Sequence, residues 1–313
     1  MNSAMPVSVP SVSFPAASVP AASVPAASVS AASAASTAAK RREFRKLHES
    51  GCFVIPNPWD IGTARYLQHL GYKALATTSG GFAYAVGHAD DEVPLLPMLA
   101  HIGELAAATA VPVNADFGDG YGDDPEGVAA NVRLCVGTGV AGLSIEDSTG
   151  DKEQPLYDFA QAVARVRAAR AAIDEAGGEV VLTGRCEGFL VGRPDLPEVI
   201  RRLQAYAAAG ADCLYAPGIK TREQIAAVVA AVAPRPVNVL VSSASGLTVA
   251  DLAALGVRRI SVGSALSRAA WHAFMRAARE IAEAGTFNCF AEVVPAAELN
   301  GFFHDDAKAR LGG

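Results

Sequence analysis

The stretch "VNADFGDGYGDDPE", residues 113–126, begins as an apolar strand and runs on into five carboxylates and three glycines. Negative charge and backbone freedom are costly to place next to a buried strand unless a site needs them. In barrels built from alternating strands and helices, the chemistry lies at the C-terminal ends of the strands. The stretch therefore predicts a strand end that contributes to a site, provided that the rest of the chain repeats this unit.

The unit is repeated eight times, as short apolar runs bounded by Gly, Pro or polar residues, each followed by a longer segment, several of them helix-like and rich in Ala, Leu, Arg and Glu. Short runs of this kind are typical of strands buried on both faces. The pattern predicts a (β/α)8 TIM barrel over residues 40–285. A doubly wound sheet is the alternative, but strand one leads into "PNPWDIGTA" rather than a glycine fingerprint. The predicted strands are 52–55, 74–77, 111–115, 141–145, 180–183, 213–216, 237–241 and 259–262, and the clearest helices are 125–136, 157–176, 196–209 and 222–232.

Two segments flank the predicted barrel. Residues 1–39 contain the internal repeat "ASVPAASVPAASVSAAS" and offer little side-chain surface to bury, so we expect a disordered extension. Residues 286–313 form a C-terminal tail. The amphipathic stretch 264–284 and the apolar "FNCFAEVV" that follows have the makings of an interface at which a helix is exchanged between subunits.

Composition excludes several classes of protein. Lys and Arg number 26 against 32 Asp and Glu, and the basic residues are scattered, which disfavours nucleic-acid binding. Five cysteines without a CxxC pair argue against a disulfide framework or a zinc site and indicate a reducing compartment. We find neither a membrane-spanning run nor a signal peptide, and expect a cytoplasmic protein.

Four consecutive strand ends carry polar groups that a barrel would bring to one rim. They are "TTSGG" at 77–81, Asn114 with Asp116, Glu146, and Arg185. Carboxylates without basic neighbours in sequence repel one another, and a divalent cation resolves that conflict. Oxygen ligands alone suit Mg²⁺, with Mn²⁺ as a substitute. Helix capping or ion pairing by Asp116 and Glu146 is an equally weighted alternative.

Two further elements of this rim suit an anionic ligand. The turn Thr77-Thr78-Ser79-Gly80-Gly81 offers hydroxyl and backbone N–H groups to a carboxylate, although an ordinary glycine turn has the same sequence. Arg185 at the end of an apolar strand needs an anionic partner, which is a substrate carboxylate or phosphonate, or else Glu187 or Glu146.

The ordered set "TTSGG", "GHADDE", "NADFGDGYGD", "GLSIEDS" and "GRCEGF" resembles the isocitrate lyase and phosphoenolpyruvate mutase superfamily over residues 44–284. The resemblance implies Mg²⁺-dependent chemistry at the C–C or P–C bond beside an α-oxo acid, through an enolate. It also implies a barrel whose last helix is often exchanged between the subunits of a homo-dimer or homo-tetramer. It places Ser79, Gly80 and Gly81 at the substrate carboxylate, with Thr77 beside them. It also places Asp90, Asp116 and Glu146 at the metal, and Arg185 at the distal anionic group.

Three departures from this resemblance matter. Asn114 stands where the family's "DAD" signature has its first aspartate, which leaves Asn114 as a weaker metal ligand, with Asp119 as a compensating carboxylate. Thr77 replaces an aromatic residue. The loop 148–158, "STGDKEQPLYD", lacks both the lyase cysteine motif and the longer mutase loop. Lys152 is that loop's one cation and could act over the site, or could simply be solvated.

The hypothesis favoured by these residues is a Mg²⁺-dependent carbon–carbon lyase or decarboxylase acting on a small di- or tricarboxylate, with Arg185, Glu146 and Lys152 as candidate catalytic residues. One alternative is a P–C bond enzyme of the phosphoenolpyruvate mutase or phosphonopyruvate hydrolase type. Another is a barrel that binds a carboxylate without catalysis, for which Asn114 is the best argument.

Overall fold

The protein is described by a computed structural model that covers residues 31–311. Eight parallel strands form one sheet in the order β1-β8-β7-β6-β5-β4-β3-β2. Each predicted strand is present, shortened or shifted by one or two residues at its ends. The strands are β1 Phe53–Ile55, β2 Leu75–Ala76, β3 Val113–Ala115, β4 Gly142–Glu146, β5 Val181–Arg185, β6 Cys213–Tyr215, β7 Val237–Leu240 and β8 Arg259–Ser261.

The sheet closes into a barrel, which confirms the predicted (β/α)8 fold. β1 pairs with β8, and the remaining seam is bridged by the Ala76 N–H, which donates to the Pro56 carbonyl at 3.0 Å. Asn57 adds a second closure, because its Nδ2 donates to the Thr77 carbonyl while its Oδ1 accepts from the N–H groups of Val262 and Gly263. All strand ends of the barrel therefore face one rim.

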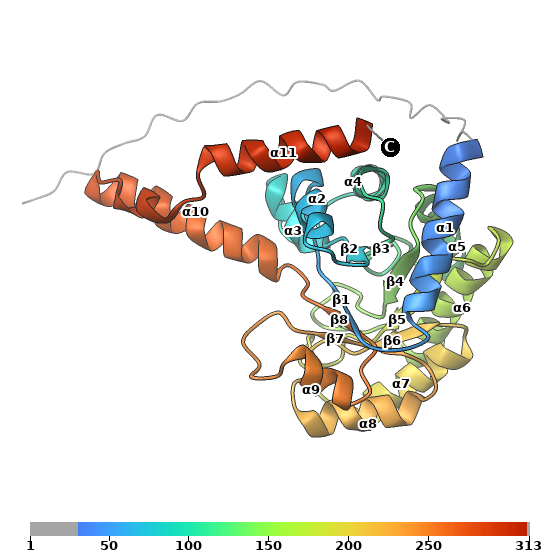
Figure 1. Cartoon of the computed structure of the whole chain (residues 1–313). Helices are drawn as coiled ribbons and strands as arrows, with labels where there is room; N and C mark the ends of the chain where they lie inside the picture. The colour runs from blue at the N-terminus through green and yellow to red at the C-terminus, as the bar shows by residue number, and fades with distance from the viewer. Residues whose placement is uncertain (1–30, 312–313) are drawn as a thin grey trace, which may run out of the picture.

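The helices follow their strands and surround the barrel (Figure 1). Side-chain caps fix several of their starts: Asp124 accepts from the Gly127 N–H at 2.7 Å at the start of α5, with Pro125 in the first turn. One acid of the opening stretch is thus a helix cap. The helices are α1 Ala31–Leu47, α2 Ile61–His69, α3 Ser79–Ala85, α4 Leu95–Ala108, α5 Pro125–Gly137, α6 Phe159–Glu175, α7 Leu196–Ala208, α8 Arg222–Val232, α9 Val249–Ala254, α10 Ala265–Ala284 and α11 Ala296–Leu311, with a 3-10 turn η1 at Asn288–Glu292.

Helix α1 closes the N-terminal end of the barrel. Phe44 is fully buried against lumen residues of β1, β2, β5 and β6. Lys40 donates to the Ala106 carbonyl at 2.9 Å, and Arg45 donates to the Glu179 carbonyl at 2.8 Å. This anchoring corrects the expectation of disorder for residues 31–39, which form the first half of α1; residues 1–30 lie outside the described part of the chain.

The C-terminal segment leaves the barrel and returns to it. α10 projects away from the barrel, and α11 runs back over α2 (Figure 1). Arg65 of α2 forms an ion pair with Asp306 of α11 at 3.2 Å, and the rings of Tyr66 and Phe302 meet edge to face. Part of the predicted tail is therefore a packed helix. Among the described helices, none is both long and apolar enough to cross a membrane.

Candidate active site

A cavity of about 300 Å³ opens at the C-terminal ends of the strands. Its wall brings together the turn after β2, the ends of β3 and β5, the loop before α4 and the start of α10. The rim-facing residues used below are Ser79, Gly80, Asp90, Asp116, Arg185 and Arg268. The predicted convergence of strand ends is therefore present as one hollow.

The turn after β2 is tied to the end of β3. The Ser79 N–H and hydroxyl both donate to Asp116 Oδ2, at 3.1 and 3.0 Å. In return, the Asp116 N–H donates to Thr77 Oγ1 at 2.9 Å. Thr78 caps α3 by accepting from the Gly81 N–H at 3.2 Å, so Gly81 is buried in the helix start. These bonds fix Ser79 and Asp116 against each other at the rim.

Asp90 lies directly over Gly80. A Cβ atom on Gly80 would stand only 2.5 Å from Asp90 Oδ2, so only glycine allows the carboxylate this close to the backbone. Burial raises the pKa of Asp90, and the charges of Asp91 and Asp116 raise it further. Asp91, which sequence reasoning did not select, adopts a left-handed φ of 68° and has its own pKa raised by burial and by Asp116.

Arg185 is the hub of the acidic residues. Its Nη1 lies 3.1 Å from both Asp116 Oδ1 and Glu146 Oε2, and its Nε donates to Glu187. Burial alone would lower the pKa of Arg185, but Glu146 and Glu187 raise it well above its ordinary value. Nε and Nη1 carry these contacts, which leaves Nη2 without a partner among residues 36–310.

Negative charge exceeds positive charge around Arg185, since three carboxylates share one guanidinium. Burial raises the pKa of Glu146 well above its ordinary value, although Arg185 opposes the shift. In the part of the chain that is described, no three His, Cys, Asp or Glu side chains converge as ligands of a single ion. Asp90 and Asp116, which line the cavity, supply carboxylate oxygens, the donor type by which one or two side chains hold a hydrated Mg²⁺.

The remaining predicted residues lie in different places. Asn114 is 4% exposed and lines the cavity below the rim, and its Oδ1 has no hydrogen-bond partner in the described part of the chain. Glu146 reaches the cavity only through Arg185. Lys152 is exposed on the loop 148–156, whose ends are joined by a bridge between Ser148 and Leu156, and it does not line the cavity.

Asp119 has a different role from the one considered for it. Its Oδ2 accepts from the Tyr157 hydroxyl at 3.0 Å and from buried Arg165 at 3.3 Å. Arg165 also stacks on the Tyr157 ring at 3.8 Å. Asp119 therefore joins the loop after β3 to the segment that follows loop 148–156. It does not replace the carboxylate that Asn114 lacks.

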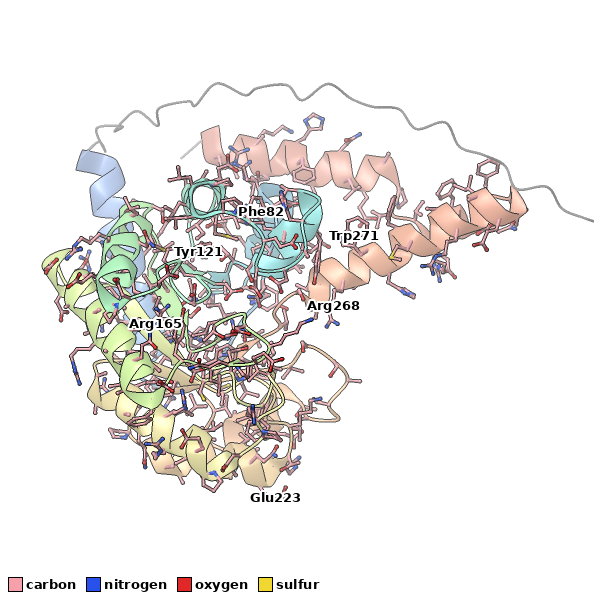
Figure 2. All side chains as sticks on the ribbon, turned by 180° about the vertical axis from the view of Figure 1, so that it is seen from behind. Phe82, Tyr121, Arg165, Glu223, Arg268 and Trp271 are labelled. Atoms are coloured by element: carbon pink, nitrogen blue, oxygen red, sulfur yellow. The ribbon has the colours of Figure 1, made fainter. Side chains whose placement is uncertain are left out.

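Sequence reasoning missed two basic residues of the cavity. Arg268 lies in the first turn of α10 beside the barrel, where its Nη2 donates to the Ser242 carbonyl at 2.8 Å (Figure 2). Arg259 of β8 lines the deeper part of the cavity. The available signal was the inward alternation of β8, which places Arg259 and Ser261 on the lumen face.

Residues 44–282 match the family described as phosphoenolpyruvate phosphomutase. The chain belongs to this family, and its resemblance to the wider phosphoenolpyruvate mutase and isocitrate lyase superfamily is confirmed. Membership makes the chain an enzyme of a lyase and mutase superfamily.

Two curated relatives share most of the chain. A Mycobacterium tuberculosis protein described as uncharacterized is 34% identical over 242 residues, which cover 77% of this chain and 89% of that protein. Oxaloacetate decarboxylase from Paraburkholderia xenovorans is 30% identical over 237 residues, which cover 73% of this chain and 76% of that enzyme.

Solved structures give the same placement. A Burkholderia cenocepacia protein described as a candidate lyase/mutase superposes with a TM-score of 0.82 at 47% identity, covering 86% of this chain and 97% of that one. Oxaloacetate acetylhydrolase bound to its product oxalate superposes with a TM-score of 0.76 at 27% identity, covering 88% and 99%. 2,3-Dimethylmalate lyase superposes with a TM-score of 0.75 at 27% identity, covering 88% of this chain and 97% of that one. The named activities among these relatives favour a lyase.

Proposed function

We propose that this chain is a Mg²⁺-dependent lyase or decarboxylase that cleaves the C–C bond beside the α-oxo or α-hydroxy carboxylate of a small di- or tricarboxylate, through an enolate. One observation carries the proposal. The Ser79 turn is hydrogen-bonded to Asp116, and Asp116 is ion-paired to Arg185, so a carboxylate-binding turn, a carboxylate suited to a metal and a guanidinium share one cavity.

The turn is suited to hold the reacting end of the substrate. The Ser79 hydroxyl and backbone N–H already satisfy a carboxylate, that of Asp116. Because Gly80 has no side chain, a substrate carboxylate can approach the backbone there. Binding at this turn places the α-carbon of the substrate beside Asp116.

Arg185 is suited to orient a second anionic group. Its three acid partners fix the guanidinium and keep it charged, while Nη2 stays available to a ligand. A guanidinium that is already oriented loses little side-chain entropy when it binds.

Asp116 and Asp90 would hold a hydrated Mg²⁺, with Glu146 and Glu187 acting through Arg185. A bound Mg²⁺ supplies positive charge beside the negative charge that develops on the substrate oxygen. Lys152 does not reach the cavity in the described chain, so we assign protonation of the enolate to water.

The test is a thermal-shift measurement with Mg²⁺ alone, oxalate alone and both together, because oxalate mimics the enolate of pyruvate. We expect the full shift only with both. Asp116→Asn should abolish the combined shift and lower kcat/KM by at least about 100-fold on the best acid. Asp123→Asn, an exposed residue of the same loop, is the matched control and should behave as wild type.

Product analysis separates the candidate reactions. From oxaloacetate, a decarboxylase releases pyruvate and CO₂, whereas an acetylhydrolase releases oxalate and acetate. Phosphonopyruvate turnover would instead support a P–C bond enzyme. A wild-type protein that shows no Mg²⁺-dependent oxalate shift and turns over none of these acids would contradict the proposal and favour a binding protein.

A further inference from the structure

Arg259 is buried in the barrel lumen, at 3% exposure, and its hydrogen-bond partners among the described residues are all neutral groups. Its Nε donates to Asn238 Oδ1 and its Nη2 to Thr183 Oγ1, both at 2.9 Å, and its Nη1 meets His48 Nε2 at 3.3 Å. A guanidinium has five N–H groups, so one hydrogen on each terminal nitrogen is left over.

The charge of Arg259 has no counter-charge among residues 36–310. The other arginines buried in this barrel each face an acid: Arg165 pairs with Asp119, Arg202 with Asp147, and Arg185 with three carboxylates. The groups that sense Arg259 are His48, whose pKa is lowered to about 3 by burial and by this charge, and Cys213. A buried charge without a partner is costly, so its presence calls for a ligand.

The lower part of the cavity is polar where barrels usually pack Val, Ile and Leu. Its walls include Asn114, Ser144, Asn238 and Ser261 together with Arg259. These small polar groups are neutral, so they leave the charge of the guanidinium uncancelled, as an anion site requires.

This lower part of the cavity, the floor, lies one layer of side chains below Arg185. Arg259 bonds to Thr183, which precedes Arg185 by two residues on the same face of β5. Two residues along a strand span about 7 Å. The cavity thus has acids around Arg185 at the rim and an unpaired cation at its floor.

We propose that the floor around Arg259 is an anion subsite that receives a carboxylate of a dicarboxylate substrate whose reacting end lies at the Ser79 turn. This inference rests on the function proposed above and deepens it. It assigns the selectivity for two carboxylates to Arg259 as well as to Arg185. Monocarboxylates would leave the floor cation uncompensated and bind more weakly.

The test compares L-malate with L-lactate by calorimetric titration in the presence of Mg²⁺. Both acids carry the same 2-hydroxy carboxylate, and only malate carries a second one. Wild type should bind malate about tenfold or more tightly than lactate. Arg259→Met should reduce that ratio several-fold while leaving lactate binding unchanged, and Arg185 accounts for the preference that remains. Arg258→Met is the matched control, since Arg258 directly precedes β8, donates to the Gly51 carbonyl and does not line the cavity.

The oxalate measurement distinguishes failure of the anion subsite from failure of the proposed function. Oxalate is too short to reach the floor, so Arg259→Met should still show the Mg²⁺-dependent oxalate shift. Failure of wild type to show that shift, together with no turnover of the candidate acids, would overturn the proposed function. A folded Arg259→Met protein that binds oxalate and keeps the full wild-type preference for malate over lactate would overturn this inference but not the proposed function. The inference would also be overturned if wild type bound malate and lactate equally well while chloride stabilised wild type but not Arg259→Met. That result would identify a site for inorganic anions. If Arg259→Met does not fold, Arg259→Lys keeps the charge and should retain part of the preference.

Discussion

At the scale of single residues, Gly80 controls how closely an acid can approach the turn at Ser79. An added Cβ would lie 2.5 Å from Asp90 Oδ2, and the obstacle is the carboxylate itself. In Gly80→Ala, Asp90 must therefore move away from Ser79 and Asp116. We expect the Mg²⁺-dependent thermal shift with oxalate to fall sharply, while the free energy of unfolding changes by about 1–3 kcal/mol.

The measurement for Gly80→Ala is oxalate titration alongside urea unfolding. Gly137→Ala is the control, because a Cβ there meets nothing within 4 Å. If Gly80→Ala binds oxalate as wild type does, Asp90 has no part in the site.

Residue identities at the rim were predictable from the sequence, but their partners were not. Polar groups after apolar runs placed Ser79, Asp116 and Arg185 at one rim. The alternatives for Arg185, substrate or a neighbouring acid, could not be separated, since its simultaneous pairing with Asp116, Glu146 and Glu187 depends on side-chain directions across three strands. Arg259 was missed because its lack of an acid is visible only once the barrel is closed.

At the scale of elements, helix α4 supports helix α3, which begins at Ser79, through a stacked pair of rings. The ring of His101 lies 3.8 Å from that of Phe82 in α3, and its Nε2 is buried without a partner. Burial lowers the pKa of His101 to about 4, with Asp60 opposing the shift. The helix that begins at Ser79 thus packs on a neutral imidazole.

This pairing predicts acid sensitivity. Below pH 6.5 the unfolded chain takes up a proton on His101, whereas the folded protein does so only near pH 4. The stabilising contribution is full above pH 6.5 and is lost as the pH falls toward 4, by up to about 3 kcal/mol. Urea midpoints at pH 7.5 and 5.0 should differ less in His101→Leu than in wild type. His88→Gln, in an exposed loop, is the control, and an equal pH difference in all three proteins would refute the assignment.

All eight strands were located from sequence because runs buried on both faces leave a plain apolar signal. Their ends were less predictable: β2 has two residues, since "TTSGG" turns at once into α3. The first half of helix α1 was not predicted because "AASAASTAA" has no amphipathic pattern. Its alanines favour a helix once Lys40 and Arg45 anchor the chain.

At the scale of the whole molecule, α10 presents an apolar stripe that is exposed in the described part of the chain. Trp271, Phe274, Met275 and Ile281 are all exposed, Phe274 at 60%, on a helix that stands away from the barrel (Figure 1, Figure 2). A single helix seldom leaves so much apolar surface in water. The stripe continues into Phe287 and Phe290 around η1, so a second copy of the chain would find an extended surface to cover.

We therefore expect a homo-oligomer that depends on this stripe. Phe274→Glu places a charge in its centre and should weaken association by at least about 2 kcal/mol, which appears as monomer in light scattering after size exclusion. His272→Glu adds a charge on another face of α10 and should leave the oligomer intact. Because α10 also carries Arg268 to the cavity mouth, the Phe274→Glu monomer should bind oxalate more weakly as α10 loses its support. A wild-type protein that is monomeric at micromolar concentration would mean that α10 is covered by something other than this chain.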